Sequence, residues 1–494
     1  MQKWLVLFSV GIVILLVNLD STIVSLALAD IAQSLQVNLT QLQWIFAAYF
    51  LAAAMFFTVL GRLADLYGRR KLFLLGTTLF TLASLGCALA PNLSILLIFR
   101  FLQGVGFGTL GLSLVLLSQA FPPEQRGMAT GFGVMLTGVG QALGPSLGGV
   151  ILHYFNWHMI FYLNVPLGIL AFVLTLIFVA KDEPQATTKK VDWMGALLFG
   201  VGVGFIALAS NQFNMWDKKL VGVCFLIGLL VLLYFYFKSK KEAEPFIALN
   251  LLHHTEFRKI IVVRFVFMFI WMMWVFLLPL FLQNIVGFSV LKTGFILLLS
   301  TGVMAIVSPL AGKLSDYSGF KPMIVFSIVA LILLCIGFAY LTTSPSLIYL
   351  ALLLILLGIT SGVHIPTTLH ALTHVIPKNQ SGTAVGLFFT CAVLGAVLGV
   401  AFSGVIIDWC SQVHLQILLA QNHLTINAEK LIYLEQMANA SRDVHVLQTH
   451  FAPQLWQQLT QLSKLSFIHA FSSLMWINVI LSGIVFWLAC KIKS

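Results

Sequence analysis

Two ionisable side chains stand inside long apolar stretches of the sequence, where a charge is costly to keep. Asp20 lies deep within the first such stretch, and Arg100 lies within the fourth. Ionisable residues in membrane spans are rare and usually functional. A carboxylate can bind and release a proton when its desolvation and its distance from a cation change. We therefore predict that Asp20 is a proton-coupling group and Arg100 its cationic partner. A purely structural pair, or an Arg100 that snorkels to the lipid surface, is the alternative.

A second pattern, built from glycine, aspartate and basic residues, occurs twice. The segment 61–71 (GRLADLYGRRK) recurs as 312–321 (GKLSDYSGFK). We expect the glycines to permit tight turns, the aspartates to accept hydrogen bonds from a helix N-terminus or a basic residue, and the bases to bind the anionic inner leaflet. A plain membrane anchor would need only the bases. We interpret the pattern as a cytoplasmic gate formed by Gly61, Asp65, Gly68, Arg69, Arg70, Gly312, Asp316 and Gly319.

The stretch 129–152 carries small residues at a spacing of four around a proline. They are Gly140, Gly144, Pro145, Gly148 and Gly149. Such a stripe lets two helices approach closely, and the proline loosens the backbone. Taken alone, this spacing is typical of helix packing.

The composition places most of the chain in lipid. Of 494 residues, 60% are hydrophobic and 9% are charged, whereas soluble proteins are about a quarter charged. The net charge of +11 comes from basic residues in short loops between apolar stretches, so it orients the chain in the membrane and does not indicate nucleic-acid binding. The six cysteines are scattered singly and predict neither a disulfide framework nor a metal site.

A helix needs about 20 mainly apolar residues to cross the hydrocarbon core, and the sequence contains fourteen such stretches. Lys and Arg concentrate in alternate loops, which predicts a bacterial inner-membrane protein with both termini in the cytoplasm. The first stretch imitates a cleavable signal, but the polar patch 18–22 argues against cleavage. The predicted spans are 4–28, 42–60, 72–90, 93–117, 129–152, 160–180, 191–210, 219–237, 260–282, 295–312, 322–342, 346–369, 383–409 and 467–489.

The repeated segment implies an internal duplication, because each copy lies between the second and third spans of one half. We predict an N-terminal six-helix bundle (1–180), two inserted helices with their linkers (181–258) and a C-terminal six-helix bundle (259–494). Two similar bundles can rock about a central site. The polar segment 411–465 lies outside the membrane by topology. It is either a surface elaboration or contains a short amphipathic helix near 431–437.

These motifs, in this order, resemble the major facilitator superfamily, and specifically its fourteen-helix drug:proton antiporter family. The residues that carry the resemblance are the repeated gate segment, Arg100 with Gln103 and Gly104, Leu19 to Val24, Gly144-Pro145 with Gly148-Gly149, Trp157 through Asn164 and Pro166, and Leu278 to Gln283. The resemblance implies an all-α integral membrane protein with two six-helix bundles and two inserted helices. His158, Asp30 and Ser300 depart from the family's usual Arg, Pro and Pro, which weakens any transfer of a substrate.

The resemblance also implies a proton-coupled antiporter that exports a small amphipathic compound; a proton-coupled importer on the same fold is the alternative. The implied partners are a small-molecule substrate, protons and the lipid bilayer, with no cofactor, no nucleic acid and a monomeric state. No Gly-rich nucleotide-binding loop occurs, so we expect no drive by ATP. The nearest approach to a catalytic constellation is His364, His370 and His374, which lack acidic neighbours in the sequence. We therefore expect no enzyme.

The substrate cavity is expected at the midplane between the two halves. The family fold brings the first and fourth helices together, so Asp20 and Arg100 are expected to meet in the first half. The second-half counterpart of Arg100 is about Leu354, so we expect charged chemistry in the first half only. The candidate lining residues, each of which can equally be a packing residue, are Asn18, Ser21, Ser25, Trp44, Tyr49, Gln103, Gln141, Trp271, Trp274, Gln283 and His364.

Overall fold

The computed structural model describes residues 2–36, 39–182, 192–212, 216–242, 245–247, 251, 254–288, 290–376, 380–422, 424 and 453–492. Within these residues the regular structure is helical and contains no strand. They include 14 helical segments that are long and apolar enough to cross a membrane. The predicted number of spans is thereby confirmed, and the chain is a multi-pass membrane protein.

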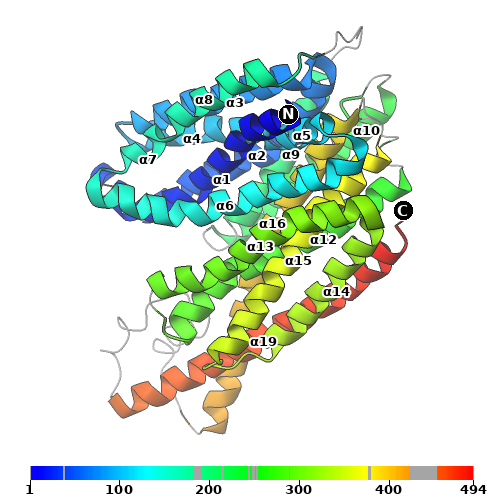
Figure 1. The fold of residues 1–494 in the computed structure, drawn as a ribbon. Coiled ribbons are helices and arrows are strands. Elements are labelled where there is room, and N and C mark those ends of the chain that lie inside the picture. The colour runs from blue at the N-terminus through cyan, green and yellow to red at the C-terminus, as the bar shows by residue number, and fades with distance from the viewer. Residues whose placement is uncertain are drawn as a thin grey trace.

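The first six spans form one bundle, drawn from blue to cyan in Figure 1. Its fourth span is interrupted at Gly108 and Thr109 and its sixth at Leu163, so each is built from two helices. The helices are α1 (Gln2–Leu35), α2 (Leu39–Tyr67), α3 (Arg69–Ala88), α4 (Leu93–Phe107), α5 (Leu110–Ala120), the short η1 (Pro123–Gln125), α6 (Arg126–Tyr154), α7 (His158–Tyr162) and α8 (Asn164–Phe178).

The last six spans form the second bundle, drawn from green to red in Figure 1. Pro279 lies inside its first helix and cannot donate a hydrogen bond to the preceding turn. The backbone widens into the π-helical turn η2 (Phe281–Ile285) directly afterwards. The other helices are α12 (Thr255–Leu280), α13 (Val290–Ser318), α14 (Phe320–Ala339), α15 (Leu347–Val375), α16 (Ser381–Gln421) and α19 (Pro453–Cys490).

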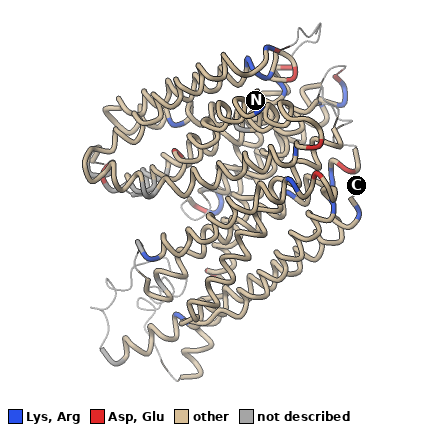
Figure 2. The backbone as a smooth tube through the Cα atoms, viewed as in Figure 1, with Lys and Arg blue, Asp and Glu red and all other residues tan. Residues whose placement is uncertain are grey.

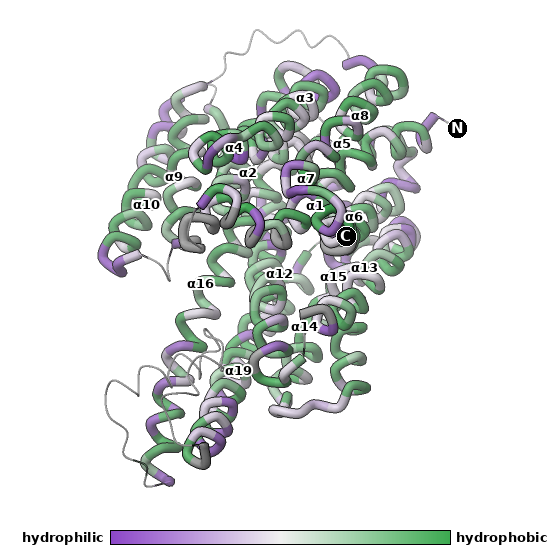
Figure 3. The backbone as a smooth tube through the Cα atoms, turned by 90° about the vertical axis from the view of Figure 1, so that its left-hand side faces the viewer, coloured by the Kyte–Doolittle hydropathy of each residue, from purple (hydrophilic) through white to green (hydrophobic). Residues whose placement is uncertain are grey.

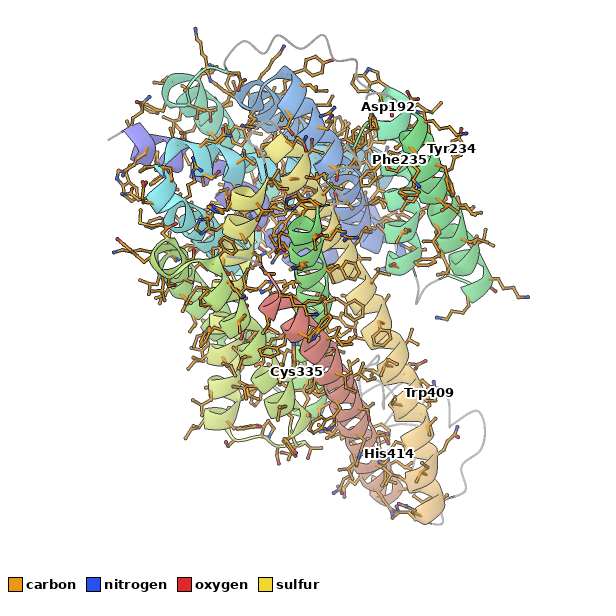
Figure 4. All side chains as sticks on the ribbon, turned by 90° about the vertical axis from the view of Figure 1, so that its right-hand side faces the viewer. Asp192, Tyr234, Phe235, Cys335, Trp409 and His414 are labelled. Carbon is orange, nitrogen blue, oxygen red and sulfur yellow. The ribbon has the colours of Figure 1, made fainter. Side chains whose placement is uncertain are left out.

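Two further helices, α9 (Trp193–Asn211) and α10 (Lys218–Lys241), pack on each other, and α9 lies against α2 and α16. Asp192 fixes this pair at one end, where Figure 4 labels it. Its carboxylate accepts from the Gly195 N–H at 2.8 Å, from Lys238 Nζ at 2.8 Å and from the Phe246 N–H at 3.3 Å. Burial alone would raise the pKa of Asp192, but these hydrogen bonds lower it overall.

The two bundles meet along two seams, α2 with α16 and α6 with α13. At one end of the molecule these helices approach backbone to backbone. A Cβ added to Gly61 would overlap the carbonyl oxygen of Gly382, and one added to Gly312 would overlap that of Gly127. We call this end, which also holds Asp65 and Asp316, the gate end.

Away from the gate end the seam between α6 and α13 opens. Gly131 packs against the Ser308 backbone, and a Cβ on Gly138 would lie 2.7 Å from Met304 Cε. Farther along, a Cβ on Gly149 of α6 or on Gly294 of α13 would meet no described atom within 4 Å. The bundles therefore touch at the gate end and diverge toward the opposite end, as Figure 1 shows.

Charge and hydropathy follow this arrangement. Figure 2 shows that most Lys, Arg, Asp and Glu residues gather at one end of the helices, and Figure 3 shows hydrophobic residues along most of their length. Hydrophilic residues return on the projecting tips of α16 and α19. A charge in the middle of the molecule is therefore an exception that needs a partner or a function.

α16 and α19 are longer than a membrane span requires. They contain 41 and 38 residues and project side by side beyond the other helices (Figures 1 and 4). We predicted that the thirteenth span ends near 409 and the fourteenth begins near 467; the helices themselves extend past both positions. Apolar residues such as Leu415, Leu419, Leu459 and Leu462 are buried where the two helices pair, so both helices continue past the predicted ends. The amphipathic helix expected near 431–437 falls outside the described residues.

Candidate functional site

Asp20 and Arg100 meet in the interior of the first bundle. Arg100 Nη1 donates to Asp20 Oδ2 at 2.7 Å, and both side chains are fully buried. Asp20 Oδ1 accepts two more hydrogen bonds, from Gln103 Nε2 at 3.0 Å and from Asn164 Nδ2 at 2.7 Å. The structure thus brings the two charges singled out in the sequence into one hydrogen-bonded ion pair.

Neighbouring helices hold Arg100 in place. Its Nε donates to the Ile45 carbonyl at 3.2 Å, and its Nη1 also donates to Gln103 Oε1 at 2.7 Å. The guanidinium carbon lies 4.3 Å from the ring centroid of Tyr49, a cation–π contact. Gln103 also donates to Ser84 Oγ at 2.8 Å. We call Asp20, Arg100, Gln103, Asn164, Tyr49 and Ser84 the ion-pair cluster; it joins α1, α2, α3, α4 and α8.

The sequence assigned no role to Asn164 or Ser84. Asn164 was one of the residues that carry the family resemblance, and a lone amide within an apolar stretch was the available signal. Ser84 gave none, because a serine in a helix commonly satisfies its hydroxyl locally. Its hydroxyl does donate to the Phe80 carbonyl, at 2.7 Å, which leaves the oxygen free to accept from Gln103.

At the gate end, Asp65 and Asp316 each cap a helix of the opposite bundle. Asp65 of α2 accepts from the Gly382 N–H at 2.8 Å and the Thr383 N–H at 2.7 Å, in the first turn of α16. Asp316 of α13 accepts from the Gly127 and Met128 N–H groups at 2.7 and 3.0 Å, in the first turn of α6. A carboxylate is favourable there because the first N–H groups of a helix lack partners and carry partial positive charge.

The two caps differ in their other contacts. Asp65 also accepts from Thr383 Oγ1 at 2.8 Å and pairs with Arg69 at 3.1 Å. Asp316 faces His370 Nε2 at 3.8 Å. Arg69 directly follows Gly68 in the first half, but the residue that follows Gly319 in the second half is Phe320, which cannot form an ion pair. The first cap is therefore held by more hydrogen bonds than the second.

The gate glycines have two separate roles. Gly68 and Gly319 have φ angles of 105° and 80° and make the turns that end α2 and α13, a conformation that favours glycine. Our prediction of a turn at Gly61 is wrong. Gly61 and Gly312 lie within helices, because α2 and α13 continue almost to the turns, and they permit the close backbone approach between the bundles.

Arg69 and Arg70, predicted to bind the lipid leaflet, also have protein partners. Arg69 pairs with Asp65, and Arg70 Nη2 donates to the Leu176 carbonyl at 2.7 Å. The backbone N–H groups of Arg70 and Lys71 donate to the Asp182 carboxylate at 3.0 Å each. These contacts tie the start of α3 to the end of α8.

The small-residue stripe of α6 faces α1. A Cβ on Gly140 would lie 2.6 Å from the Leu15 carbonyl oxygen, and one on Gly144 would overlap the Thr22 side chain. Gly148 is buried, whereas Gly149 is exposed; the side chain of Pro145 lies outside the described set. The stripe thus acts as a close contact between two helices of one bundle.

Several predicted lining residues do not lie on a surface between the halves. Tyr49 and Gln103 belong to the ion-pair cluster. The Trp44 ring lies 6.0 Å from that of Trp216, beside the inserted pair. Trp274 is fully buried inside the second bundle with its ring 4.1 Å from that of Phe338, so its prediction as a lining residue is corrected to a packing residue.

A polar face of α1 and α6 remains a candidate for substrate contact. Gln141 Nε2 donates to Asn18 Oδ1 at 3.4 Å, and Ser21 Oγ donates to the Asn18 carbonyl at 2.7 Å. Nothing is described for the side chain of Ser25. Trp271 and Gln283 of the second bundle are partly exposed, so they stay predictions.

One buried charge was missed altogether. Arg264 of α12 is 3% exposed, and its position near the start of the predicted span made it look like one of the helix-end basic residues. His364, a predicted lining residue, lies near it: its ring stacks on that of Phe267, one turn along from Arg264, with centroids 3.6 Å apart. We expected charged chemistry in the first half only, but the second half also buries a charge.

Comparison with known proteins agrees with this architecture. The family described as Major Facilitator Superfamily matches residues 10–400. The riboflavin transporter RibZ of Clostridioides difficile is 31% identical over 81% of this chain and 87% of its own length. The multidrug resistance protein Stp of Mycobacterium tuberculosis is 33% identical over 82% of this chain and 76% of its own.

A solved structure supports the fold. The crystal structure of the human organic anion transporter MFSD10 superposes with a TM-score of 0.65, covering 97% of this chain and 99% of that one, at 14% sequence identity. At that identity the likeness speaks for the fold alone. The family match, the relatives and the fold together place this chain in the major facilitator superfamily, as a transporter and not an enzyme.

Proposed function

We propose that the protein is a proton-coupled antiporter that exports a small amphipathic compound by alternating access. The observation that carries the proposal is the ion-pair cluster, in which a fully buried carboxylate meets a fully buried guanidinium. Removing two charges from water is expensive, so such a pair is weak support for stability and stronger support for a switch. The likeness to a relative named a multidrug resistance protein favours export.

The cluster couples proton binding to movement as follows. Asp20 belongs to α1, and its three hydrogen bonds come from residues of α4 and α8, so they link α1 to both helices. Protonation removes its negative charge and leaves Arg100 without a counter-ion. The protonated cluster is therefore stable only where α1 shifts relative to α4 or where Arg100 finds another partner. Proton binding then changes the relative free energies of the two access states.

The gate end supplies the second state-dependent contact. The two aspartate caps and the close glycine pairs hold the bundles together there. Opening this end breaks both caps and exposes helix N-termini that need other partners. We assign the gate end to the cytoplasm, so that this arrangement faces outward. The positive-inside rule supports the assignment, because Lys and Arg are concentrated at this end, with Arg62, Arg69, Arg70 and Lys71 in the first gate segment alone (Figure 2).

The remaining features of the proposal follow from the sequence. We place the protein in the inner membrane with both termini in the cytoplasm. It acts as a monomer, uses the proton gradient and needs no cofactor. A proton-coupled importer on the same fold is the alternative, and it differs in the direction in which protons and substrate move.

Purified protein in vesicles with an imposed pH gradient tests the proposal. The probes are riboflavin, fluorescein and rhodamine 123, with proton flux followed by a pH-sensitive dye. We expect counter-flow of protons and probe in the parent, loss of uphill accumulation in Asp20→Asn, and normal transport in Asp30→Asn, an exposed acid of the same helix. Uphill accumulation by Asp20→Asn at the parental level would refute the assignment of Asp20. Flow of protons and probe in one direction would favour the importer.

A further inference from the structure

The second bundle buries a cation that has no acidic partner. Arg264 is 3% exposed, and among the described residues it has neither an ion pair nor a hydrogen bond. Its Nε and Nη1 are buried without an acceptor. Its one direct contact of note is the face of Phe388, whose ring centroid lies 5.0 Å from the guanidinium carbon. Arg264 thus differs from Arg100, which has both a carboxylate and neutral acceptors.

A buried guanidinium without an acidic partner or a hydrogen-bond acceptor destabilises the folded protein. Burial of an uncompensated charge is among the most destabilising features a structure can contain. The cation–π contact with Phe388 offsets only part of that cost. A buried guanidinium with neither a carboxylate nor a hydrogen bond needs an explanation, and an acceptor that arrives with a ligand is one.

The surroundings of Arg264 provide a second unpartnered group and two aromatic faces. The His364 ring lies parallel to that of Phe267, with centroids 3.6 Å apart and an interplanar angle of 6°. Its Nδ1 is paired with Ser327 Oγ at 2.9 Å, whereas its Nε2 is buried without a partner. The Phe388 ring borders the guanidinium on the side of α16. Polar and aromatic groups of this kind suit an anion attached to a flat apolar body.

The site lies directly behind the gate. Phe388 follows Thr383, the residue capped by Asp65, by five positions, or roughly 8 Å along the helix. The next two residues form the seam: the Phe389 ring stacks on that of Phe57 with centroids 5.4 Å apart, and Thr390 Oγ1 lies 2.8 Å from Thr58 Oγ1. Separation of α2 from α16 at the gate end would therefore open the wall beside Arg264.

We propose that Arg264, together with His364, binds an anionic group of the transported molecule, so that the substrate is an amphipathic organic anion. The proposal rests on the transport function proposed above and names its substrate class. A carboxylate or a phosphate would complete the hydrogen bonds of Arg264, with the bidentate geometry that guanidinium favours. The body of the molecule would lie against Phe267 and Phe388. The first bundle then handles the proton and the second bundle the charge of the substrate.

Equilibrium binding by purified protein tests this without any need for transport. Fluorescein and rhodamine 123 share a xanthene ring system but carry opposite charge. We expect the parent to bind fluorescein at least ten-fold more tightly, Arg264→Gln to lose about 10- to 100-fold of that affinity, and Arg264→Lys to keep part of it. Arg258→Gln removes an equal charge from an exposed position of the same helix and should bind as the parent does. A parent without preference for fluorescein, or an Arg264→Gln variant with unchanged preference, overturns the proposal.

Thermal unfolding measurements distinguish a loss of binding from a loss of the fold. Arg264→Gln removes an unpaired buried charge, so without ligand its Tm should equal or exceed that of the parent, whereas fluorescein should raise the Tm of the parent alone. A lower Tm, restored by no anion, would indicate that Arg264 is a structural residue and would overturn the proposal.

Competition identifies the source of the anionic group. Displacement of fluorescein by phosphatidylglycerol in mixed micelles would show that a lipid headgroup reaches the site, and displacement by inorganic phosphate would show that the anion alone suffices. Both results support an anion site. Asp20→Asn separates this proposal from the antiporter proposal, because it should abolish proton-driven accumulation and leave the preference for fluorescein unchanged.

Discussion

The two six-helix bundles share one scaffold but carry different charges in their interiors. In the first bundle Arg100 pairs with Asp20, donates to a side-chain amide and a backbone carbonyl, and lies over an aromatic ring. In the second bundle Arg264 is 3% exposed, and among the described residues it has no acidic partner and no hydrogen bond, with the Phe388 ring as its one cation–π contact. This difference is why we propose the proton for the paired charge and the substrate for the unpaired one.

The gate end shows the opposite trend, since there the duplication is kept. Each bundle offers one aspartate near the end of its second helix and one helix N-terminus to receive the other's aspartate. The contacts between the bundles have stayed alike, whereas the buried charges inside the two bundles differ. This division explains why a motif repeat in the sequence locates the gate but does not locate the second buried charge.

The largest effect should come from removing one partner of the ion pair between Asp20 and Arg100. Arg100→Ala leaves Asp20 buried without its cation, and removal of one partner of a buried pair costs about 3–5 kcal/mol. We expect a strong fall in the Tm and loss of transport. The double variant Asp20→Asn/Arg100→Gln has no buried charge, so it should recover most of the stability and none of the proton coupling. Recovery of coupling in the double variant would show that protons travel elsewhere, with Asp30, Asp408 or His364 as the next candidates.

A smaller effect should separate the two gate caps. Asp65→Asn and Asp316→Asn each weaken hydrogen bonds to a helix N-terminus, and bonds to a charged group are worth about 1.5–3 kcal/mol. Both variants should insert into the membrane and transport poorly. The loss should be greater for Asp65→Asn, because Asp65 also holds Thr383 Oγ1 and Arg69.

Spin labels at Tyr67 and Tyr317, both exposed, would measure this gate directly. The fraction of molecules with the longer distance between the two labels should be greater in Asp65→Asn than in Asp316→Asn. Equal populations of the open form in the two variants would show that the number of hydrogen bonds does not set the strength of each cap. Normal transport by Asp65→Asn would show that Asp65 has no role in the gate.

The third effect concerns the small-residue stripe. In Gly144→Ala the new methyl group would overlap Thr22 of α1, whereas in Gly149→Ala it would meet no described atom within 4 Å. Forcing atoms into a packed contact typically costs about 1–3 kcal/mol. Thermal unfolding and vesicle transport should therefore suffer in the first variant and stay normal in the second. Equal tolerance of both changes would argue that the contact between α1 and α6 is loose.

The long apolar stretches predicted the span number, and the family resemblance predicted the meeting of Asp20 with Arg100. The sequence could not predict contacts that depend on helix rotation. Trp274, predicted to line the cavity, packs inside the second bundle. Arg264, near the start of its span, is buried and does not lie at the membrane surface. Gly61 was misinterpreted because a glycine in a helix contact and a glycine in a turn look alike in sequence.

The smallest effect is expected from the partly exposed ion pair of Asp192 with Lys238, which lies outside both bundles. Its loss gives a reference for the cost of changing the buried charges. Asp192→Asn keeps the helix cap, since Asn caps as well as Asp, and loses the ion pair with partly exposed Lys238. Such pairs are worth about 1 kcal/mol or less. The pKa of Asp192 is lowered in the folded protein, so the contribution of the pair is present above the unfolded value of about 3.9 and is lost as the pH falls through the lower folded value. Unfolding at pH 7 and at pH 3 should show the difference from the parent shrinking in acid. Asp217→Asn, an exposed cap that accepts from the Lys219 N–H, is the control and should show less change; a pH-independent difference for Asp192→Asn would mean that its role is packing and not charge.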